Sequence, residues 1–122
     1  MELKSVVLNG IKVVNMTMHD IVYTSGGQTI VFPGNKEACV RVTQEYIPIG
    51  NLFGVNMEIK AGEKHVEGLP KQQDNVYYIV SGLVRAELPE RKDLLAPTQN
   101  IKHQTKNEKG HTVAISHFET NL

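Results

Sequence analysis

The sequence predicts a mainly β fold: one small domain over residues 1–122, built as an antiparallel β-barrel or β-sandwich with one short helix. Three observations lead to this prediction. Short runs of β-branched and apolar residues recur along the chain between glycine-rich turns. Only one segment has helical spacing, and 122 residues with 40% hydrophobic and 21% charged residues suit a single globular core. A sheet of this kind buries one face against a second sheet or by closing on itself.

Paired β-branched runs around glycine turns predict two hairpins at the start of the chain: residues 3–8 with 11–15, and residues 21–24 with 29–32. The first turn, Asn9-Gly10, tolerates the positive φ values that a two-residue hairpin loop needs. After a third turn at residues 33–35, the segment 38–43 places Ala38, Val40 and Val42 on one side. We therefore expect a half-buried strand after the second hairpin.

The middle of the chain predicts an extension of the sheet followed by a loop. Residues 52–59 have strand character, and Gly54 is expected at a bulge or at a close approach of two backbones. Residues 65–75 are mostly polar and are expected to form an exposed loop. Val76–Val80 lacks alternation, which is typical of a strand covered on both faces. We expect this segment at the centre of the sheet.

One short helix and a last hairpin complete the predicted order. The segment Gly82–Leu88 has helical spacing, with Leu83, Ala86 and Leu88 on one side, and Pro89 ends it. The last hairpin pairs residues 100–106 with residues 111–118. Its edge strands carry no proline and few charges, so they favour pairing with a second copy. We therefore expect a homo-oligomer, a dimer or a tetramer.

Charge and composition exclude several classes of partner. Thirteen basic residues balance thirteen acidic ones, so the chain lacks the positive field that holds duplex nucleic acid. The single cysteine cannot form an internal disulfide, and no apolar run is long enough to cross a membrane. Residues 1–5 do not have the pattern of a signal peptide. The sequence therefore predicts a protein of the cytoplasm.

Recognisable catalytic and metal-binding motifs are missing from the sequence, so neither an enzyme nor a cofactor is expected. It has no phosphate-binding loop, nucleophile elbow, metalloprotease helix or Cys-x-x-Cys pair. In the predicted last hairpin, His103 lies on the opposite face from His111 and His117, which are themselves about 20 Å apart along one strand. Residues 62–82 loosely resemble the metal-binding strands of cupin barrels, but His65 is their only histidine. No metal site is expected.

Aromatic and arginine side chains are the candidate ligand-binding groups. Tyr77 and Tyr78 point to opposite faces of one strand, so one of them is expected in the core and the other is free to stack on a ligand. Guanidinium groups grip phosphate or carboxylate with two hydrogen bonds, which makes Arg41 and Arg91 candidates for an anion. For Arg91 the alternative is a structural ion pair with Glu90, with Asp93 or with a neighbouring subunit.

Three segments together resemble a widespread family of small proteins of phages and prophages. They are residues 15–21 (Asn-Met-Thr-Met-His-Asp-Ile), 66–70 (Val-Glu-Gly-Leu-Pro), and 78–81 (Tyr-Ile-Val-Ser) continuing to 94–97 (Leu-Leu-Ala-Pro). The family's first motif reads Asn-Leu-Thr-Pro-His-Asp-Ile, so Met18 stands here in place of proline. The resemblance covers roughly residues 13–97 and leaves out the last hairpin.

This resemblance implies a phage-encoded accessory protein acting in the cytoplasm of the infected cell. It is similar to oligomeric anti-CBASS sponge proteins, which sequester cyclic-nucleotide immune signals of the host without catalysis. On that reading the ligand is a small anionic nucleotide, with Arg41 and Arg91 on its phosphates. Tyr77 or Tyr78 stacks on a base, and the hydrogen-bond donors are Thr17 and His19. The alternative is a structural or assembly component of the phage particle.

Overall fold

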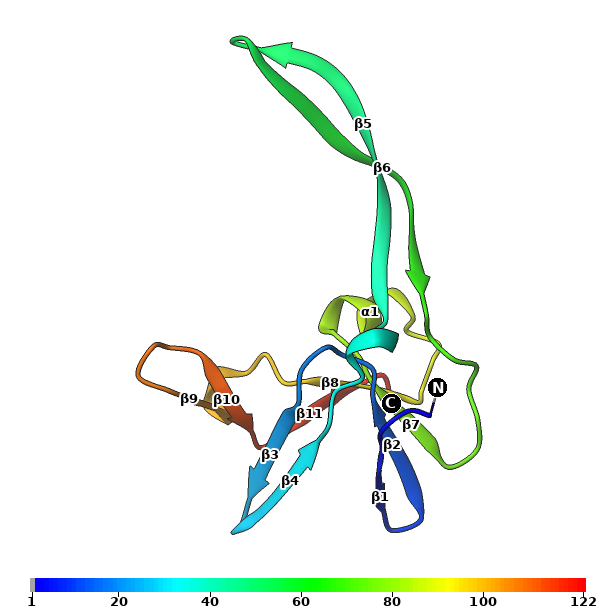
Figure 1. Cartoon of the computed structure of the whole chain (residues 1–122), viewed down its shortest axis with the longest axis vertical. Helices are drawn as coiled ribbons and strands as arrows, with labels where there is room; N and C mark the ends of the chain where they lie inside the picture. The colour runs from blue at the N-terminus through cyan, green and yellow to red at the C-terminus, as the bar shows by residue number, and fades with distance from the viewer. Residues whose placement is uncertain (1) are drawn as a thin grey trace.

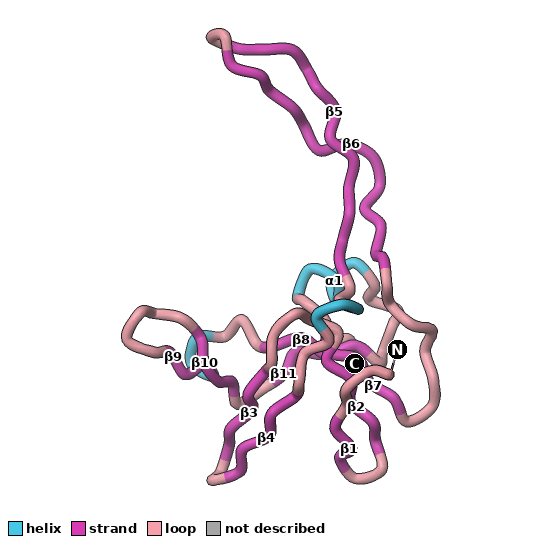
Figure 2. The backbone as a smooth tube through the Cα atoms, viewed as in Figure 1, coloured by secondary structure: helices cyan, strands magenta, loops and turns pink. Residues whose placement is uncertain are grey.

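The computed structural model describes residues 2–122, and its fold is mainly β, as predicted (Figures 1 and 2). The strands of this range are β1 (Val6–Leu8), β2 (Ile11–Asn15), β3 (Ile21–Ser25), β4 (Gln28–Phe32), β5 (Arg41–Leu52), β6 (Val55–Glu67), β7 (Val76–Ile79), β8 (Leu94–Pro97), β9 (Gln104–Lys106), β10 (Thr112–Ile115) and β11 (Phe118–Thr120). The helical elements are α1 (Gly82–Glu87) and two 3-10 turns, Lys36–Ala38 and Ile101–His103.

The strands form three sheets. A five-stranded sheet has the order β1-β2-β7-β8-β11, a four-stranded sheet has the order β4-β3-β10-β9, and β5 pairs with β6 as a separate two-stranded sheet. The two larger sheets are mixed, because β7 runs parallel to β2 and β8, and β10 runs parallel to β3. A hydrophobic cluster that includes Val13, Phe32 and Ile79 joins the two larger sheets, so the fold is sandwich-like. Its three parallel strand pairs differ from the predicted antiparallel sheet.

Both predicted N-terminal hairpins are confirmed. Asn9 and Gly10 have φ values of 50° and 81°, the conformation that a two-residue turn between twisted strands requires. The second turn is made in the same way by Gly26 and Gly27, with φ values of 57° and 78°. Local turn chemistry thus determines the register of β1 with β2 and of β3 with β4.

The predicted central strand is also confirmed. β7 lies between β2 and β8, and its side chains enter two different cores. Tyr78 lies in a cluster covered by α1 and by the start of β5, whereas Tyr77 and Ile79 lie in the cluster between the two larger sheets. This segment lacks alternation because both of its faces are covered.

Two predictions next to this core need correction. Lys36–Ala38 is a 3-10 turn, so the strand begins at Arg41 rather than at residue 38. The prediction of which side of α1 is buried is also wrong, because Val84 is fully buried, whereas Leu83 is 71% exposed. Val84 follows the buried Val80 by four residues, so the strand that enters the helix, rather than the helix's own spacing, decides which side faces the core.

The middle of the chain differs most from expectation, because β5 and β6 form one long hairpin that projects from the body (Figure 1). We call this hairpin, residues 41–67, the arm. Its turn is Phe53-Gly54, with φ values of 56° and 80°. Gly54 is thus a turn residue rather than a bulge, and no described atom lies within 4 Å of a Cβ placed there. Residues 65–67 belong to β6 rather than to a loop.

The last hairpin forms, but its register is shifted from the predicted one. Lys106 lies opposite Thr112 instead of His111, and an irregularity follows between Thr112 and Ala114. Beyond this irregularity Ala114 lies opposite Thr105, two residues from the predicted register. His103 lies in the 3-10 turn before β9 and His117 lies between β10 and β11, so neither belongs to the paired strands. Their rings stack with centroids 3.7 Å apart, so the prediction that these two histidines lie on opposite faces is wrong.

Over residues 2–122, none of the helices has the length and apolar character needed to span a lipid bilayer.

Candidate functional site

The six predicted ligand-binding residues do not converge on one pocket. Thr17 and His19 lie between β2 and β3, and Arg41 begins the arm. Tyr77 and Tyr78 lie on opposite faces of β7, and Arg91 lies between α1 and β8. Of these residues the structure brings two pairs together: Thr17 with His19, around Asn15, and Tyr78 with Arg91, around the carboxylate of Asp93.

Thr17 and His19 take part in a hydrogen-bond network centred on the buried Asn15. The Asn15 side-chain amide donates to the carbonyl oxygens of His19 and Phe32, at 2.8 and 2.9 Å. Its oxygen accepts from the backbone N–H and the hydroxyl of Thr17, at 3.0 and 2.7 Å. Gly34 packs so closely that a Cβ would lie 2.8 Å from the carbonyl carbon of His19. This network joins the β2–β3 connection to the end of β4.

Tyr78 and Arg91 belong to a second polar cluster, which lies beside the loop that precedes β7. Arg91 donates to both carboxylate oxygens of Asp93, at 2.9 and 2.8 Å, and to the carbonyl oxygen of Pro70, at 3.0 Å. Hydrogen bonding to Asp93 raises the pKa of Arg91. Burial, followed by the charge of Asp93, raises the pKa of Tyr78, which is 2% exposed. Neither tyrosine face is open to a ligand at this position.

Arg41 remains exposed at the start of the arm. It lies opposite Glu67 in the β5–β6 register, and its guanidinium is 3.8 Å from the Sγ atom of Cys39. Tyr77 packs at the edge of the core between the two larger sheets. Neither residue lies beside the polar clusters around Asn15 or Asp93, so the predicted nucleotide site is not assembled from these positions within one chain.

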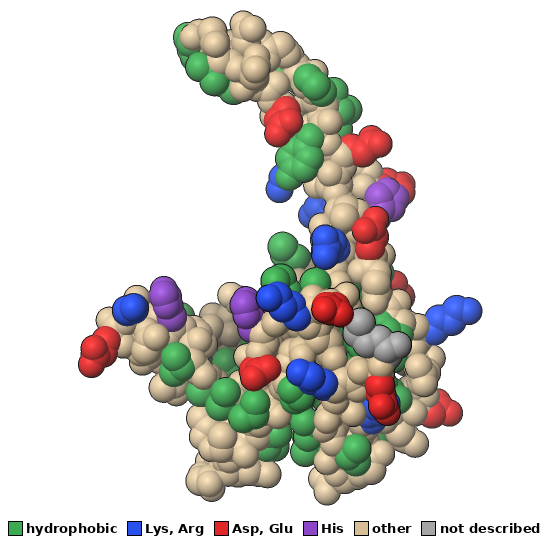
Figure 3. All heavy atoms as spheres, in the orientation of Figure 1, with side chains coloured by type: hydrophobic (Ala, Val, Ile, Leu, Met, Phe, Trp, Pro, Cys, Tyr) green, Lys and Arg blue, Asp and Glu red, His purple; other side chains and the backbone are tan. Residues whose placement is uncertain are grey.

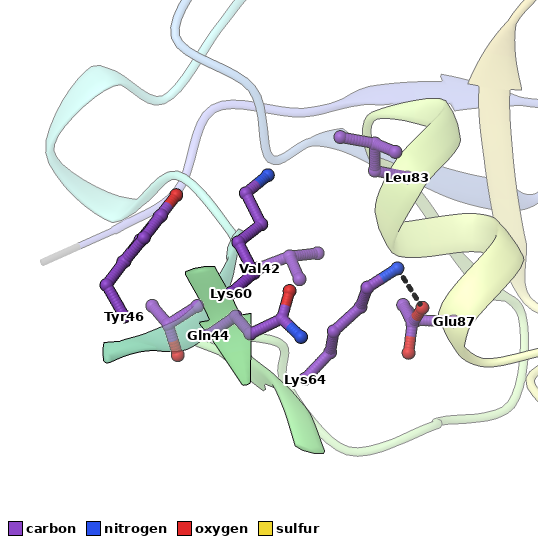
Figure 4. A pocket seen from close by; sticks show the side chains of 8 residues that line it. Val42, Gln44, Tyr46, Lys60, Lys64, Leu83 and Glu87 are labelled. Atoms are coloured by element: carbon purple, nitrogen blue, oxygen red, sulfur yellow. Dashed lines mark ion pairs between the residues drawn. The ribbon is translucent and has the colours of Figure 1, made fainter. Parts of the chain in front are cut away.

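A cavity of about 380 Å³ lies where the arm meets α1 (Figure 4). It is lined by Val42, Thr43, Gln44, Tyr46, Lys60, Lys64, Leu83 and Glu87. The ammonium group of Lys60 is 6.0 Å from the centroid of the half-exposed Tyr46 ring. Lys64 forms an ion pair with Glu87 at 3.3 Å. An aromatic surface next to two ammonium groups suits a planar ligand that carries negative charge.

The outer part of the arm has one apolar face and one polar face. Residues paired across two antiparallel strands share a face, and the register pairs Ile47 with Ile59, and Leu52 with Val55. These four side chains are each about half exposed, and Met57 lies between them. The opposite face carries Tyr46, Pro48, Asn51, Asn56, Glu58 and Lys60. Figure 3 shows hydrophobic side chains at the tip and along the outer arm, with most of the charged ones nearer the body.

The tip and the apolar face are uncovered in the described chain. Phe53, in the turn, is 97% exposed. An isolated two-stranded hairpin is at best marginally stable in water, and large apolar side chains concentrated on one surface are typical of contact sites. The alternation at residues 55–61 was the sequence signal for this surface. It could not be interpreted without knowing that β5 and β6 pair only with each other in residues 2–122.

One further cluster contains a nucleophilic hydroxyl. The Ser116 hydroxyl is 2.8 Å from Nδ1 of His117, and His103 stacks on the imidazole. In a catalytic triad, a third polar group orients the histidine through its other ring nitrogen. Among the described residues His117 makes no such second hydrogen bond. This geometry fits a surface contact between neighbouring side chains.

Residues 2–122 contain no group of three histidine, cysteine, aspartate or glutamate side chains placed to hold a metal ion. Comparison with protein family models, with curated proteins and with solved structures finds no match to this chain. Its function is therefore inferred from its own residues.

Proposed function

We propose that this chain is a non-catalytic assembly protein that uses the arm to join protein chains, as a structural component of a phage particle would. The observation that carries the proposal is the uncovered apolar face of the arm, which includes Ile47, Leu52, Val55 and Ile59. The phage origin rests on the resemblance of three segments taken together, residues 15–21, 66–70 and 78–97. Such a protein assembles in the cytoplasm of the host cell.

The way the arm is attached supports this role. The body has two cores of its own, and only the base of the arm, through Val42 and Val66, contributes to one of them. The outer arm therefore adds little to the stability of the body while exposing apolar surface to water. An element of this kind is retained when its contacts are made with another chain.

The test is a variant without the arm, in which a two-residue Asn-Gly turn replaces residues 44–64 and connects Thr43 to His65, which are neighbours in the register. We expect the full chain to sediment as an oligomer or complex in extracts of the cells that express it. The shortened chain should sediment as a monomer, with a melting temperature within a few degrees of the parent. Equal sedimentation of the two proteins would refute the proposal.

A second candidate function is sequestration of a small anionic nucleotide, favoured by the cavity between the arm and α1. The exposed Tyr46 ring provides a stacking surface, and Lys60 and Lys64 provide positive charge for phosphates. Of the residues proposed from the sequence, Arg41 is the one next to this cavity along the chain, since Val42 lines it. This function requires no catalytic group.

Binding of a fluorescent cyclic dinucleotide to the purified full chain tests this candidate. Lys60→Ala should weaken binding about tenfold, the usual value for one charged hydrogen bond. Lys71→Ala, in the exposed loop before β7, is the matched control and should leave binding unchanged. The same affinity for the parent and Lys60→Ala, or no binding by the parent chain, would remove the cavity from consideration.

A further inference from the structure

The outer edge of β6 is regular over Val55–Ala61. Each residue of this stretch has a partner on β5, without a gap on the β6 side. The edge of β5 is different, because Pro48 lacks an N–H group and the register shifts beside it, between Pro48 and Gly50. Proline and irregularities of this kind protect a sheet edge from further pairing. Of the two edges of the arm, only that of β6 is suited to accept another strand.

We infer that the partner of this edge is the β6 strand of a second copy of this chain, paired antiparallel about a two-fold axis at Ile59. This inference rests on the proposed assembly function and identifies the chain that the arm binds. In this register Ile59 lies opposite Ile59 of the second copy, and Met57 lies opposite Ala61 of the second copy. Each pair belongs to the apolar face, so the two apolar faces become continuous.

Within the regular stretch Val55–Ala61, the charges on the polar face favour this register. With the axis at Ile59, Glu58 of each chain lies opposite Lys60 of the other, which forms two favourable pairs. An axis at Glu58 or at Lys60 would place like charges opposite each other, and an axis at Met57 would leave both charged residues without a charged partner. An axis between two residues would bring apolar side chains opposite polar ones. Self-complementarity of the charges thus favours a second copy over an unrelated strand.

The dimensions of the arm allow this pairing. At about 3.3 Å per residue, the tip of one arm extends roughly 20 Å beyond the axis, whereas β6 of the second copy continues for about 26 Å, to Glu67. The tip therefore ends beside the base of the other arm, next to its α1, which contacts that base at Lys64. The product is a four-stranded sheet with the order β5-β6-β6-β5, whose two outer edges carry Pro48. Pairing stops at the dimer for this reason, and the sheet passes the size at which β-structure becomes stable.

Charge reversal tests the register. Glu58→Lys places two lysines opposite Lys60 residues in the dimer, and Lys60→Glu places two glutamates opposite Glu58 residues. Each variant alone should self-associate at least tenfold more weakly than the parent chain. An equimolar mixture of the two variants should restore the dimer. The introduced lysine of one chain then faces the introduced glutamate of the other, and the two native residues, Lys60 and Glu58, also face each other across the axis. Within the chain these positions lie opposite Pro48 and Tyr46, so neither variant disrupts an ion pair of the arm itself.

A cysteine experiment locates the axis independently. In a Cys39→Ser background, Ile59→Cys should form a disulfide between two chains on mild oxidation, since residues that face each other across antiparallel strands lie about 5 Å apart. Ile47→Cys is the matched control, because Ile47 lies opposite Ile59 on the neighbouring strand of the same arm. In the dimer, the two cysteines introduced at position 47 would be about 14 Å apart, which is too far for a disulfide.

The outcomes separate this inference from the proposed function. The β6 pairing would be overturned if each charge variant self-associated as tightly as the parent chain. It would also be overturned if the mixture of the two variants failed to associate. If the parent chain still forms an oligomer that the variant without the arm loses, the assembly function stands and another surface of the arm is responsible. If the parent and the shortened chain are both monomers in purified form and in extracts, both proposals fail.

Discussion

Replacing Arg91 with alanine should destabilise the body strongly, because it removes the partner of a buried charge. The Arg91 guanidinium donates two hydrogen bonds to the Asp93 carboxylate, at 2.9 and 2.8 Å. Asp93 is 3% exposed, and its carboxylate receives hydrogen bonds only from Arg91 among the described residues. The third hydrogen bond of Arg91, to the carbonyl oxygen of Pro70 at 3.0 Å, is lost as well.

Breaking a buried ion pair by removing one partner costs about 3–5 kcal/mol in the free energy of unfolding, since the remaining charge is left without compensation. For a chain of 122 residues, an unfolding entropy of about 2.1 cal/mol/K per residue converts this loss into a fall in melting temperature of roughly 12–20 °C. Arg91→Ala should therefore be detected readily by either chemical or thermal denaturation.

The assay is urea denaturation of Arg91→Ala, Asp93→Asn and the double variant, analysed as a double-mutant cycle. A coupling free energy of about 2 kcal/mol or more is expected, because the neutral amide introduced by Asp93→Asn no longer needs the guanidinium. The reasoning is refuted if Arg91→Ala unfolds within about 0.5 kcal/mol of the parent chain, the range of an ordinary surface substitution. Unchanged stability together with a loss of nucleotide affinity would instead favour the role of Arg91 as a phosphate ligand.

Three further outcomes follow from the buried polar groups and the close packing of the body. Asn15→Ala should lower the free energy of unfolding by about 3 kcal/mol in urea, since the buried carbonyl oxygen of Phe32 and the backbone N–H group of Thr17 lose their partner. Gly34→Ala should cost about 1–3 kcal/mol in the same assay, because the new Cβ meets the backbone of His19; an unchanged midpoint would exclude that contact. Stability should also decline as the pH rises above about 10, since burial raises the pKa of Tyr78 above its ordinary value of 10.0 and the native state then holds a proton that the unfolded state has released. Denaturation of Tyr78→Phe across this pH range should show a smaller decline, and an equal one would contradict the assignment.

Much of the fold could be predicted from the sequence because its signals are local. The Asn9-Gly10 turn needs only two residues that tolerate positive φ, and it determines the hairpin around it. Likewise, Val76–Ile79 has no alternation because both of its faces are covered, and a run of apolar residues records this directly. Ser81 accepts a hydrogen bond from the N–H group of Val84, a short-range capping contact that begins the predicted helix.

The candidate site could not be predicted in the same way, because it depends on pairing between distant segments. Tyr46 and Lys60 approach each other only because β5 and β6 pair in one particular register. Phe53 is an unfavourable residue for a positive φ, so the turn at the tip lacks a strong local signal. The family-like segment around Asn15 did contain functionally interesting side chains, yet their hydrogen bonds serve the connection between β2 and β4.

The sequence by itself determined that the chain is mainly β, where its first hairpins turn, and which strand lies at the centre of the core. Only the tertiary structure decided that residues 41–67 leave the body as an arm, that Arg91 holds Asp93, and that His103 stacks on His117. The physical reason is the range of the interactions. Turns and burial patterns arise from neighbouring residues, whereas register, ion pairing and exposure of an apolar face depend on which distant segments the whole chain brings together.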